Sequence, residues 1–569
     1  MTAAHATPMT AHAPWLQHYP QGIDWAAPLT PSTVHAMLDA TVAKLGSRRA
    51  TNFLGKTLTY SEIGRLVDQA AAGLQKLGVK KGSKVGLFLP NSPTFIVFYY
   101  ATLKAGGTVV NYNPLYTVEE LAHQIKDSDT ELMVTLDLKV LFEKVESLIS
   151  TGVLKRAIVA SFPALLPSAK SVLFKLFRGR ELANVSGSKV KDKVLFEGDV
   201  LSGGGTFTPV AIDPMTDLAV LQYTGGTTGT PKGAMLTHAN LSCNVQQSMH
   251  WTRPYTTPGT ERVLAILPFF HVFAMTGIMN LGIAEGSELI ILPRFVLDDA
   301  MKLIDKSKPT IMPGVPTIFG AIMNHKDAKK LDLRSLKICL SGGAPLPAEI
   351  KKGFESITGA TLVEAYGLSE TSPGATINPL DGRAKTGSIG QPIPGTTISI
   401  REVGAPEKEM PLGQSGEICI KGPQVMKGYY KKPQDTADVF IGDFFRTGDV
   451  GYMDAEGFIF IVDRIKDMII CSGFKVFPRH LEEKIYEHPA VEEVTVIGIK
   501  DKYRGEAPKA FIKLKAGMTA TKDDIMKHLE PKLSKIELPA EIEFRAELPK
   551  TMIGKLSKKE LKAEEAAKA

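Results

Sequence analysis

The stretch LAVLQYTGGTTGTPKG, residues 218–233, joins a short apolar run to a loop of glycine and threonine. The apolar run predicts a buried strand, because it is short and ends at glycines. Glycines allow backbone N–H groups to turn towards an anion, and Lys232 adds a positive charge. The loop is not a Walker A loop, because Gly233 follows the lysine where that motif requires serine or threonine. The stretch therefore predicts a phosphate-binding loop at the carboxyl end of a strand.

The sequence around this loop alternates short apolar runs with helical patterns. Alternation of this kind predicts an α/β fold, in which helices cover both faces of parallel sheets and ligands bind at the carboxyl ends of strands. We expect strands at residues 84–89, 109–112, 264–267, 289–292 and 337–340, and helices at residues 95–104 and 117–126.

The pattern of the chain changes near Gly387. From there short strands and Gly/Pro turns dominate, which predicts a small barrel-like subdomain. Beyond Lys466 the chain predicts a smaller α+β domain, with a helix at residues 480–487 and strands at 494–499 and 510–514.

Composition and charge narrow the class of protein. The chain has 569 residues, of which 44% are hydrophobic and 22% charged, as in a globular protein of several domains. A net charge of +7 is mild over this length and argues against a nucleic-acid partner. The widely spaced cysteines predict reduced thiols and a cytoplasmic location; they are Cys243, Cys339, Cys419 and Cys471.

Two apolar segments raise the question of a membrane. Residues 263–284 contain no Asp, Glu, Lys or Arg, but Pro268 divides them, so we expect a buried strand followed by a buried helix. Residues 171–180 (SVLFKLFRGR) place apolar and basic residues on a helical period. A surface helix is the favoured interpretation, and a peripheral contact with the inner face of a membrane is the alternative.

Three further groups carry chemically useful side chains. Residues 366–371 (YGLSET) combine an aromatic ring, a glycine turn, a hydroxyl and a carboxylate, which suits base stacking and Mg²⁺ binding. Residues 446–449 (RTGD), with Asp463 and Arg464, offer a carboxylate for ribose hydroxyls. Lys555 lies in a lysine-rich tail, PKTMIGKLSKKEL. Each group alone is a weak signal, because an isolated Asp or Arg more commonly forms a surface ion pair and one lysine among many is normally a solvated charge.

In their order along the chain, these motifs resemble those of the acyl-adenylate-forming enzymes, and within them those of the bacterial fatty-acyl-CoA synthetases. The matching stretches are YTGGTTGTPKG, YGLSET, RTGD, DRIKDMIICSGFKVFP and PKTMIGKLSKKEL, supported by LPFFHVFAMT, SGGAPLP, GSIGQPIPG and KGPQVMKGYY. The likeness extends from residue 58 to residue 561. It implies a loose leader at 1–27, an AMP- and acyl-binding domain at 28–463, a hinge at 464–466 and a mobile C-terminal domain at 467–569.

The resemblance implies an ATP-dependent fatty-acid–CoA ligase. A fatty carboxylate would attack the α-phosphate of ATP to give acyl-AMP and pyrophosphate, and the thiol of CoA would then displace AMP. ATP and CoA are the implied co-substrates, and Mg²⁺ is the implied cofactor, held by Thr224 and Glu370. The implied ATP- and AMP-binding residues are Thr224, Gly225, Gly226, Thr227, Thr228, Gly229, Lys232, Gly343, Ala344, Tyr366, Gly367, Ser369, Asp449 and Arg464.

The resemblance also assigns roles in the second domain. Lys555 would bridge the substrate carboxylate and the α-phosphate, stabilising charge where it develops. Lys466 matches the hinge position, Gly473 the catalytic glycine that lines the pantetheine tunnel, and Lys475 a basic position near the CoA phosphate. Acylation of Lys555 by a lysine acetyltransferase would remove its charge and stop adenylation.

The implied acyl-pocket residues are Phe270, His271, Met275, Gly314, Val315 and Thr317. His271 is interpreted as part of the pocket wall, because its neighbours are apolar where amino-acid-activating relatives carry an aspartate. Met275 stands where some long-chain relatives have an aromatic gate, and packing is its favoured role. Ser369 stands where threonine is common, which preserves the hydroxyl.

Three functions remain open on this sequence. The first is a medium- or long-chain fatty-acyl-CoA ligase. The second is a ligase for a dicarboxylic acid such as pimelate, which would need a cation deep in the pocket. The third is a non-catalytic fatty-acid- or nucleotide-binding protein, against which Glu370, Asp449, Arg464 and Lys555 argue. A homodimer is also left open.

Overall fold

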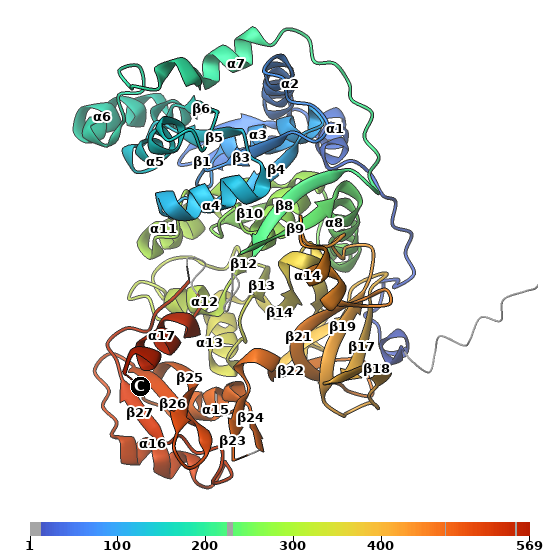
Figure 1. The fold of residues 1–569 in the computed structure, drawn as a ribbon, viewed down its shortest axis with the longest axis vertical. Coiled ribbons are helices and arrows are strands. Elements are labelled where there is room, and N and C mark those ends of the chain that lie inside the picture. The colour runs from blue at the N-terminus through green and yellow to red at the C-terminus, as the bar shows by residue number, and fades with distance from the viewer. Residues whose placement is uncertain (1–12, 225–230, 473, 552–554, 569) are drawn as a thin grey trace, which may run out of the picture.

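A computed structural model describes residues 13–224, 231–472, 474–551 and 555–568. Figure 1 shows a large N-terminal part, in which layers of sheet and helix lie one above another, and a smaller C-terminal unit below it. Three sheets of seven, fifteen and five strands organise the chain. The expected α/β class, with a large and a small domain, is confirmed.

The first sheet carries the strand that leads into the glycine loop. Its order is β7-β6-β5-β3-β4-β8-β9, and all its pairings are parallel except β8–β9. The antiparallel pair β8 (Leu218–Thr224) and β9 (Lys232–Thr237) flanks the loop. The other strands are β3 (Lys84–Leu87), β4 (Thr108–Asn111), β5 (Leu132–Leu136), β6 (Arg156–Ala160) and β7 (Val194–Phe196).

The second sheet has a parallel centre in the order β14-β13-β12-β10-β11-β1. Strands buried on both faces are uniformly apolar, which is why most of these runs are visible in the sequence. The central strands are β1 (Arg49–Phe53), β10 (Arg262–Ala265), β11 (Glu288–Ile291), β12 (Ile311–Gly314), β13 (Ile338–Gly342) and β14 (Thr361–Gly367). Antiparallel β2 (Lys56–Thr59) and β15 (Gly374–Ile377) border them.

The expected barrel-like subdomain is an antiparallel extension of this second sheet. Its first strand, β16 (Ser388–Pro392), pairs with β15 on one side and with β22 (Ile459–Arg464) on the other. Because β16 is occupied on both edges, and β18 pairs only with β17, the described strands remain an open sheet rather than a closed barrel. The others are β17 (Thr397–Glu402), β18 (Ala405–Glu409), β19 (Gly416–Lys421), β20 (Phe440–Ile441) and β21 (Phe444–Met453).

Helices cover the sheets, and polar caps determine where several of them begin. Thr59 and Glu62 form a capping box at the start of α2 (Tyr60–Lys76), and Thr117 and Glu120 form another at α4 (Val118–Ser128). The other N-terminal α-helices of three turns or so are α1 (Val34–Leu45), α3 (Pro93–Lys104), α5 (Lys139–Ser150), α6 (Ser168–Arg178), α8 (His238–Thr252), α11 (Leu297–Ser307) and α13 (Ala348–Thr358). Shorter ones are α7 (Glu197–Gly203), α12 (Pro316–Met323) and α14 (Pro433–Asp438).

Residues 263–284 form the expected strand and buried helix. β10 is followed by a continuous helical segment made of α9 (Val272–Ala274), η6 (Met275–Asn280), which is π-helical, and α10 (Leu281–Ala284). Within the described ranges, the structure contains no helix of the length and hydropathy that a membrane span requires.

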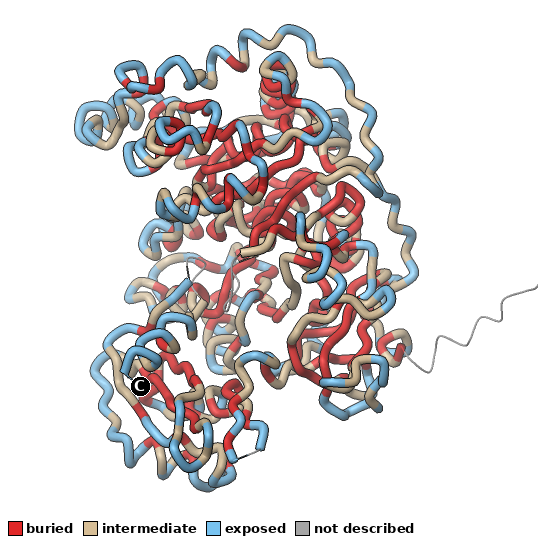
Figure 2. The backbone as a smooth tube through the Cα atoms, viewed as in Figure 1, coloured by how far each residue is buried: buried red, intermediate tan, exposed pale blue. Residues whose placement is uncertain are grey.

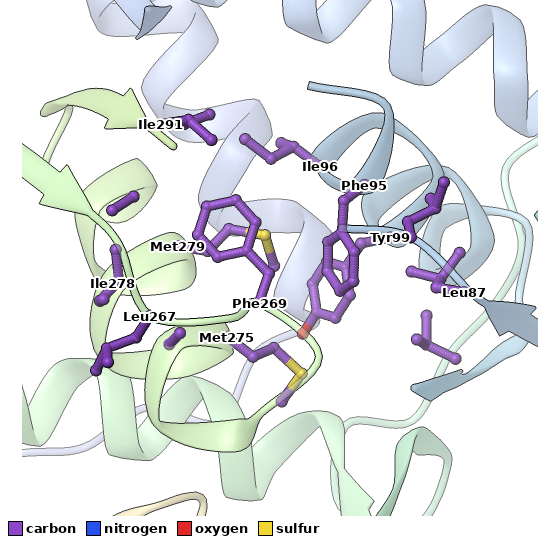
Figure 3. Packing of buried hydrophobic residues seen from close by; sticks show 14 of the residues in the cluster. Leu87, Phe95, Ile96, Tyr99, Leu267, Phe269, Met275, Ile278, Met279 and Ile291 are labelled. Carbon is purple, nitrogen blue, oxygen red and sulfur yellow. The ribbon is translucent and has the colours of Figure 1, made fainter. Parts of the chain in front are cut away.

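The core between the two large sheets is built around α3. Figure 3 shows Phe95 and Tyr99 of α3 packed beside Phe269 and Met275, which follow β10. The ring centroids of Phe95 and Phe269 are 5.7 Å apart. Figure 2 shows that these central elements are buried while the loops and outer helices are exposed. Met275 is fully buried in this core, in keeping with the packing role favoured for it.

The C-terminal unit has its own sheet in the order β24-β23-β26-β25, with β27 parallel to β26. Its elements are β23 (Ile469–Cys471), β24 (Phe474–Val476), α15 (Pro478–Tyr486), β25 (Val491–Asp501), β26 (Gly505–Leu514), α16 (Lys522–Leu529), β27 (Glu541–Phe544) and α17 (Lys558–Lys568). A separate hydrophobic cluster fills it. All four cysteines of the chain are free thiols, and all are buried.

Candidate active site

A cavity lies at the carboxyl ends of the parallel strands of the second sheet. β13 ends at its edge with Gly342, β14 with Gly367, and Val315 follows the end of β12. This is where α/β sheets bind ligands, because the strand ends and the loops after them leave a crevice. The lining residues are Asn244, Ser248, Thr252, Leu267, Pro268, His271, Phe273, Gly277, Leu281, Val315, Leu340, Gly342, Gly343, Ala365, Tyr366, Gly367, Pro373, Gly374, Ile377 and Lys555.

Lys555 enters this cavity from the C-terminal unit. The backbone on either side of residues 552–554 is paired: Thr551 N donates to Lys555 O at 2.6 Å, and Lys550 pairs with Leu556. The side chain of Lys555 runs over Gly343, where a Cβ atom would overlap its Cε and lie 2.9 Å from its Nζ. A glycine at position 343, with φ of +83°, therefore admits the lysine.

Burial makes Lys555 and His271 electrostatically distinct. Removal from water lowers the pKa of Lys555 to about 8, and the nearby charge of Arg464 acts in the same direction while Asp449 opposes it. Burial, aided by the positive charge of Lys555, lowers the pKa of His271 to about 3. His271 is therefore neutral at physiological pH. Its ring accepts a hydrogen bond from Phe273 N at the start of α9, so it helps to shape the wall of the cavity.

A carboxylate and a guanidinium from the antiparallel extension lie next to Tyr366, which lines the cavity. Asp449 of β21 and Arg464 of β22 are cross-strand partners, and Arg464 Nε lies 3.3 Å from Asp449 Oδ1. Tyr366 Oη donates to Asp449 Oδ2 at 2.6 Å. Asp449 is buried and Arg464 is exposed. The Asp449 carboxylate is therefore held in position by two partners, beside the ring that lines the cavity.

Glu370 provides a second carboxylate, on the short helix η7 (Ser369–Thr371). It is buried, and burial raises its pKa, although the hydroxyl of Tyr429 donates to its Oε1 at 2.8 Å and opposes the shift. Ser369 begins the same helix and is half-buried. Tyr429 was not anticipated from the sequence, because it lies 59 positions from Glu370 and no local pattern links the two.

The two ends of the glycine loop are held close together. Thr224 and Lys232 are paired across β8 and β9, so that the loop closes on a rigid base. The ammonium group of Lys232 is paired with Asp435 and lies 5.3 Å from the centroid of the Tyr429 ring. The central loop residues expected to bind phosphate lie outside the described residues; they are Gly225, Gly226, Thr227, Thr228 and Gly229.

The structure brings only part of the expected site into one cavity. His271, Val315, Gly343, Tyr366, Gly367 and Lys555 line it, whereas the described lining does not include Phe270, Met275, Gly314, Thr317 or Ala344. Ala344 directly follows Gly343 and is half-buried. Lys466 is exposed on the short helix η8 (Ile465–Asp467), and Lys475 is exposed on β24. Gly473 lies outside the described residues.

Some lining residues were not anticipated from the sequence. Asn244, Ser248 and Thr252 lie one turn apart on α8 and form a polar stripe along the wall. Phe273 and Gly277 come from the irregular helix after β10, where π-helical turns are common at functional sites. The spacing of four along residues 244–252 was visible in the sequence, but the face of α8 that meets the cavity was not.

The chain is similar to known proteins over nearly its whole length. The model of the AMP-binding enzyme family matches residues 38–430, and that of the AMP-binding enzyme C-terminal domain matches residues 480–555. The chain is 42% identical to a long-chain-fatty-acid–CoA ligase of Bacillus subtilis, covering 98% of this chain and 99% of that protein. It is 35% identical to the ligase of the same name from Escherichia coli O157:H7, covering 97% and 98%.

A solved structure with the same arrangement is ATP-bound MatB from Rhodopseudomonas palustris. The TM-score is 0.82 at 28% identity, covering 94% of this chain and 99% of that chain. The two family models and the full-length relatives agree with one another. The chain belongs to the AMP-binding enzyme family.

Proposed function

We propose that this protein is an ATP-dependent fatty-acid–CoA ligase. The substrate carboxylate attacks the α-phosphate of ATP, forming an acyl–phosphate bond and releasing pyrophosphate. The CoA thiol then attacks the acyl carbonyl, and AMP leaves. The observation that carries the proposal is the position of Lys555, which reaches from the C-terminal unit into a cavity otherwise built by the N-terminal part.

Lys555 acts in the adenylation step. Its ammonium group stabilises the negative charge shared between the incoming carboxylate and the α-phosphate, and burial strengthens that interaction. Asp449 accepts hydrogen bonds from the ribose hydroxyls, since Tyr366 and Arg464 already hold the carboxylate in place. Ser369 contacts the α-phosphate, and the residues of the loop flanked by Thr224 and Lys232 bind the β- and γ-phosphates.

The described residues suit a magnesium ion bound together with ATP. Glu370 is a buried carboxylate whose Oε1 accepts from Tyr429, and Thr224 supplies a hydroxyl. Mg²⁺ prefers one or two carboxylates plus substrate phosphates, and the described residues contain no cluster of three acidic, histidine or cysteine side chains that would hold it alone. When bound, the ion neutralises phosphate charge. Tyr429 keeps the Glu370 carboxylate in place.

The cavity favours an apolar monocarboxylic acid. Lys555 is the only charged side chain in its described lining, so no second cation is available for the far carboxylate of a dicarboxylic acid. Among the described residues, none with an acidic side chain lines the cavity to bind an α-amine, which argues against an amino acid. Leu267, Leu281 and Ile377 supply apolar walls for an acyl chain. The relatives from Bacillus subtilis and Escherichia coli described above are named long-chain-fatty-acid–CoA ligases, which supports a long chain.

The second half-reaction requires the C-terminal unit to turn. We propose the domain limits 28–463 and 467–569, with a hinge at 464–466 that includes Lys466. After rotation, Gly473 and Lys475 would line the path of CoA. In the arrangement seen here Lys475 is exposed and does not line the cavity, so we expect it to act only after the C-terminal unit has turned. Lys475→Glu should raise KM for CoA and leave ATP–pyrophosphate exchange unchanged. Equal losses in both assays would refute this division.

The proposed activity is tested by AMP release from ATP and Mg²⁺ in the presence of CoA. Straight-chain fatty acids, pimelate, benzoate and amino acids are compared, and the CoA thioester is identified by mass. AMP and thioester formed with fatty acids alone are the expected result. Release with pimelate would favour the dicarboxylate alternative, and binding of ATP without AMP from any acid would favour a binding protein.

We also propose that acylation of the Lys555 amine switches adenylation off. A lysine pKa lowered to about 8 leaves more of the amine in its neutral, nucleophilic form at physiological pH than an exposed lysine has. A cytoplasmic location accords with four free thiols. Protein acetylated only at Lys555 should form no acyl-AMP, while unmodified protein carried through the same procedure retains full activity. Acyl-AMP formation by the acetylated protein would refute the switch.

A further inference from the structure

Helix α6 (Ser168–Arg178) presents an apolar face to solvent. We define this apolar face as Val172, Leu173, Leu176 and Phe177, which are exposed by 57%, 52%, 72% and 76%. α6 contains no buried residue, and Figures 1 and 2 show it at the outer edge of the first sheet layer. Among the described residues, no other helix or strand carries more than one exposed large apolar side chain.

The way α6 is attached fixes which side faces outwards. At about 100° per residue, the apolar face covers roughly 140° of the helix circumference. Ser171 and Phe174, the only half-buried residues of α6, lie on the opposite side. The ring of Phe174 packs against Phe162, with centroids 5.1 Å apart. The helix is therefore anchored by its inner side, and its more apolar side remains uncovered.

Basic residues flank the apolar face. Lys170, Lys175, Arg178 and Arg180 follow one another with no acidic residue before Glu181. On the helical wheel Lys170 borders one side of the apolar face and Lys175 the other. Lys170 Nζ donates to Leu54 O at 2.7 Å, and Arg178 pairs with Glu181 at 2.8 Å. The side chains of Lys175 and Arg180 make no hydrogen bond or ion pair with any described residue.

We propose that α6 docks on the surface of an anionic phospholipid bilayer. A helix with an apolar face bordered by Lys and Arg lies in the plane of the interface, with its apolar side among the acyl chains and its basic side chains at the headgroups. The basic side chains beside the apolar face are complementary in charge to anionic headgroups, which favours an anionic bilayer over a purely apolar partner. The inference goes beyond the ligase activity and does not depend on it, since binding is measured without substrates.

The experiment is co-sedimentation of the full chain with two kinds of vesicle. One contains phosphatidylglycerol and phosphatidylcholine in equal amounts, and the other phosphatidylcholine alone. We expect stronger binding to the anionic vesicles, weakened by salt. Leu176→Glu/Phe177→Glu should lower the partition coefficient at least about 100-fold, because two apolar side chains are lost from the interface. Leu412→Glu/Met518→Glu is the matched control, since those residues are exposed elsewhere by 53% and 46%.

A second variant tests the charge independently of the apolar face. Lys175→Gln/Arg180→Gln should lower binding to the anionic vesicles about 25-fold, because each basic residue contributes about fivefold. Binding to neutral vesicles should change little. Circular dichroism and thermal unfolding check that each variant is folded.

Three results would overturn the proposal. The first is wild-type protein that sediments with neither vesicle, and the second is a loss of binding as large in the control as in the α6 variant. The third is dimerisation, in which a second copy of this chain covers the apolar face. Light scattering would then show a wild-type dimer that Leu176→Glu/Phe177→Glu converts to a monomer, and the wild-type protein would not bind lipid.

Discussion

The pH dependence of adenylation tests the role of Lys555 most directly. Burial lowers the pKa of this lysine to about 8. Its ammonium form therefore falls from about 91% of the molecules at pH 7 to about 9% at pH 9. Only the charged form stabilises the developing negative charge. The specificity constant kcat/KM reports ionisations of the free enzyme, so it should fall about tenfold over this range.

The assay is ATP–pyrophosphate exchange in the absence of CoA, which follows acyl-AMP formation alone. The kcat/KM for ATP is measured from pH 7 to 9.5 with a fatty acid that is ionised throughout. We expect a single break near pH 8, followed by a tenfold fall for each further pH unit. Thioester formation from supplied acyl-AMP and CoA should not fall, because raising the pH increases the thiolate that attacks.

Two substitutions separate charge from other effects of pH. Lys555→Arg keeps its charge throughout, because arginine is not deprotonated in this range, and its profile should lack the break. Lys555→Ala should lose about 3 kcal/mol or more of transition-state stabilisation, which is a fall of roughly 100-fold or more, and its residual rate should also lack the break. A wild-type profile that is flat to pH 9.5, or the same break in Lys555→Arg, would refute the reasoning.

Two further predictions concern residues that position this machinery. Tyr429→Phe removes the hydroxyl that donates to Glu370. The rate of adenylation should fall about tenfold and the Mg²⁺ concentration that it requires should rise, because a hydrogen bond to a charged group contributes about 1.5 kcal/mol or more. A Mg²⁺ titration identical to that of the wild type would contradict this. Gly343→Ala should slow adenylation more than thioester formation, because its Cβ would push the end of the Lys555 side chain out of its place. Gly517→Ala, with a similar positive φ and open space around it, should change neither rate. Equal losses of the two activities in Gly343→Ala would disprove the steric argument.

The parallel part of the fold was predictable because its signals are local. Strands buried on both faces are short apolar runs, and β3, β4, β8, β10, β11 and β13 lie within a few residues of their expected positions. The helices α3, α4 and α15 were also found where the periodicity placed them. The barrel-like subdomain was less well predicted. Strand spacing reveals that antiparallel strands exist, but pairing between β16 and β15 depends on residues outside that subdomain.

The candidate site shows the same division between local and distant information. Motifs such as YGLSET and RTGD are weak signals one by one, and it is their order along the chain, through its resemblance to the acyl-adenylate-forming enzymes, that predicted a nucleotide site. The link between Tyr429 and Glu370, and the polar stripe of α8 along the cavity, carried no such signal. They arise from contacts between segments that are remote in the sequence.

The sequence by itself determined the fold class and the amphipathic period of α6, and it predicted the phosphate-binding role of the loop after β8. These depend on which residues are neighbours along one strand, turn or helix. Only the tertiary structure decided that Lys555 meets Gly343 and His271 in one cavity, and that burial lowers the pKa of that lysine. It also decided that the apolar face of α6 points to solvent. The burial and the electrostatic environment of a residue depend on segments that are distant in the sequence and come together only in the folded chain, so the local sequence does not determine them.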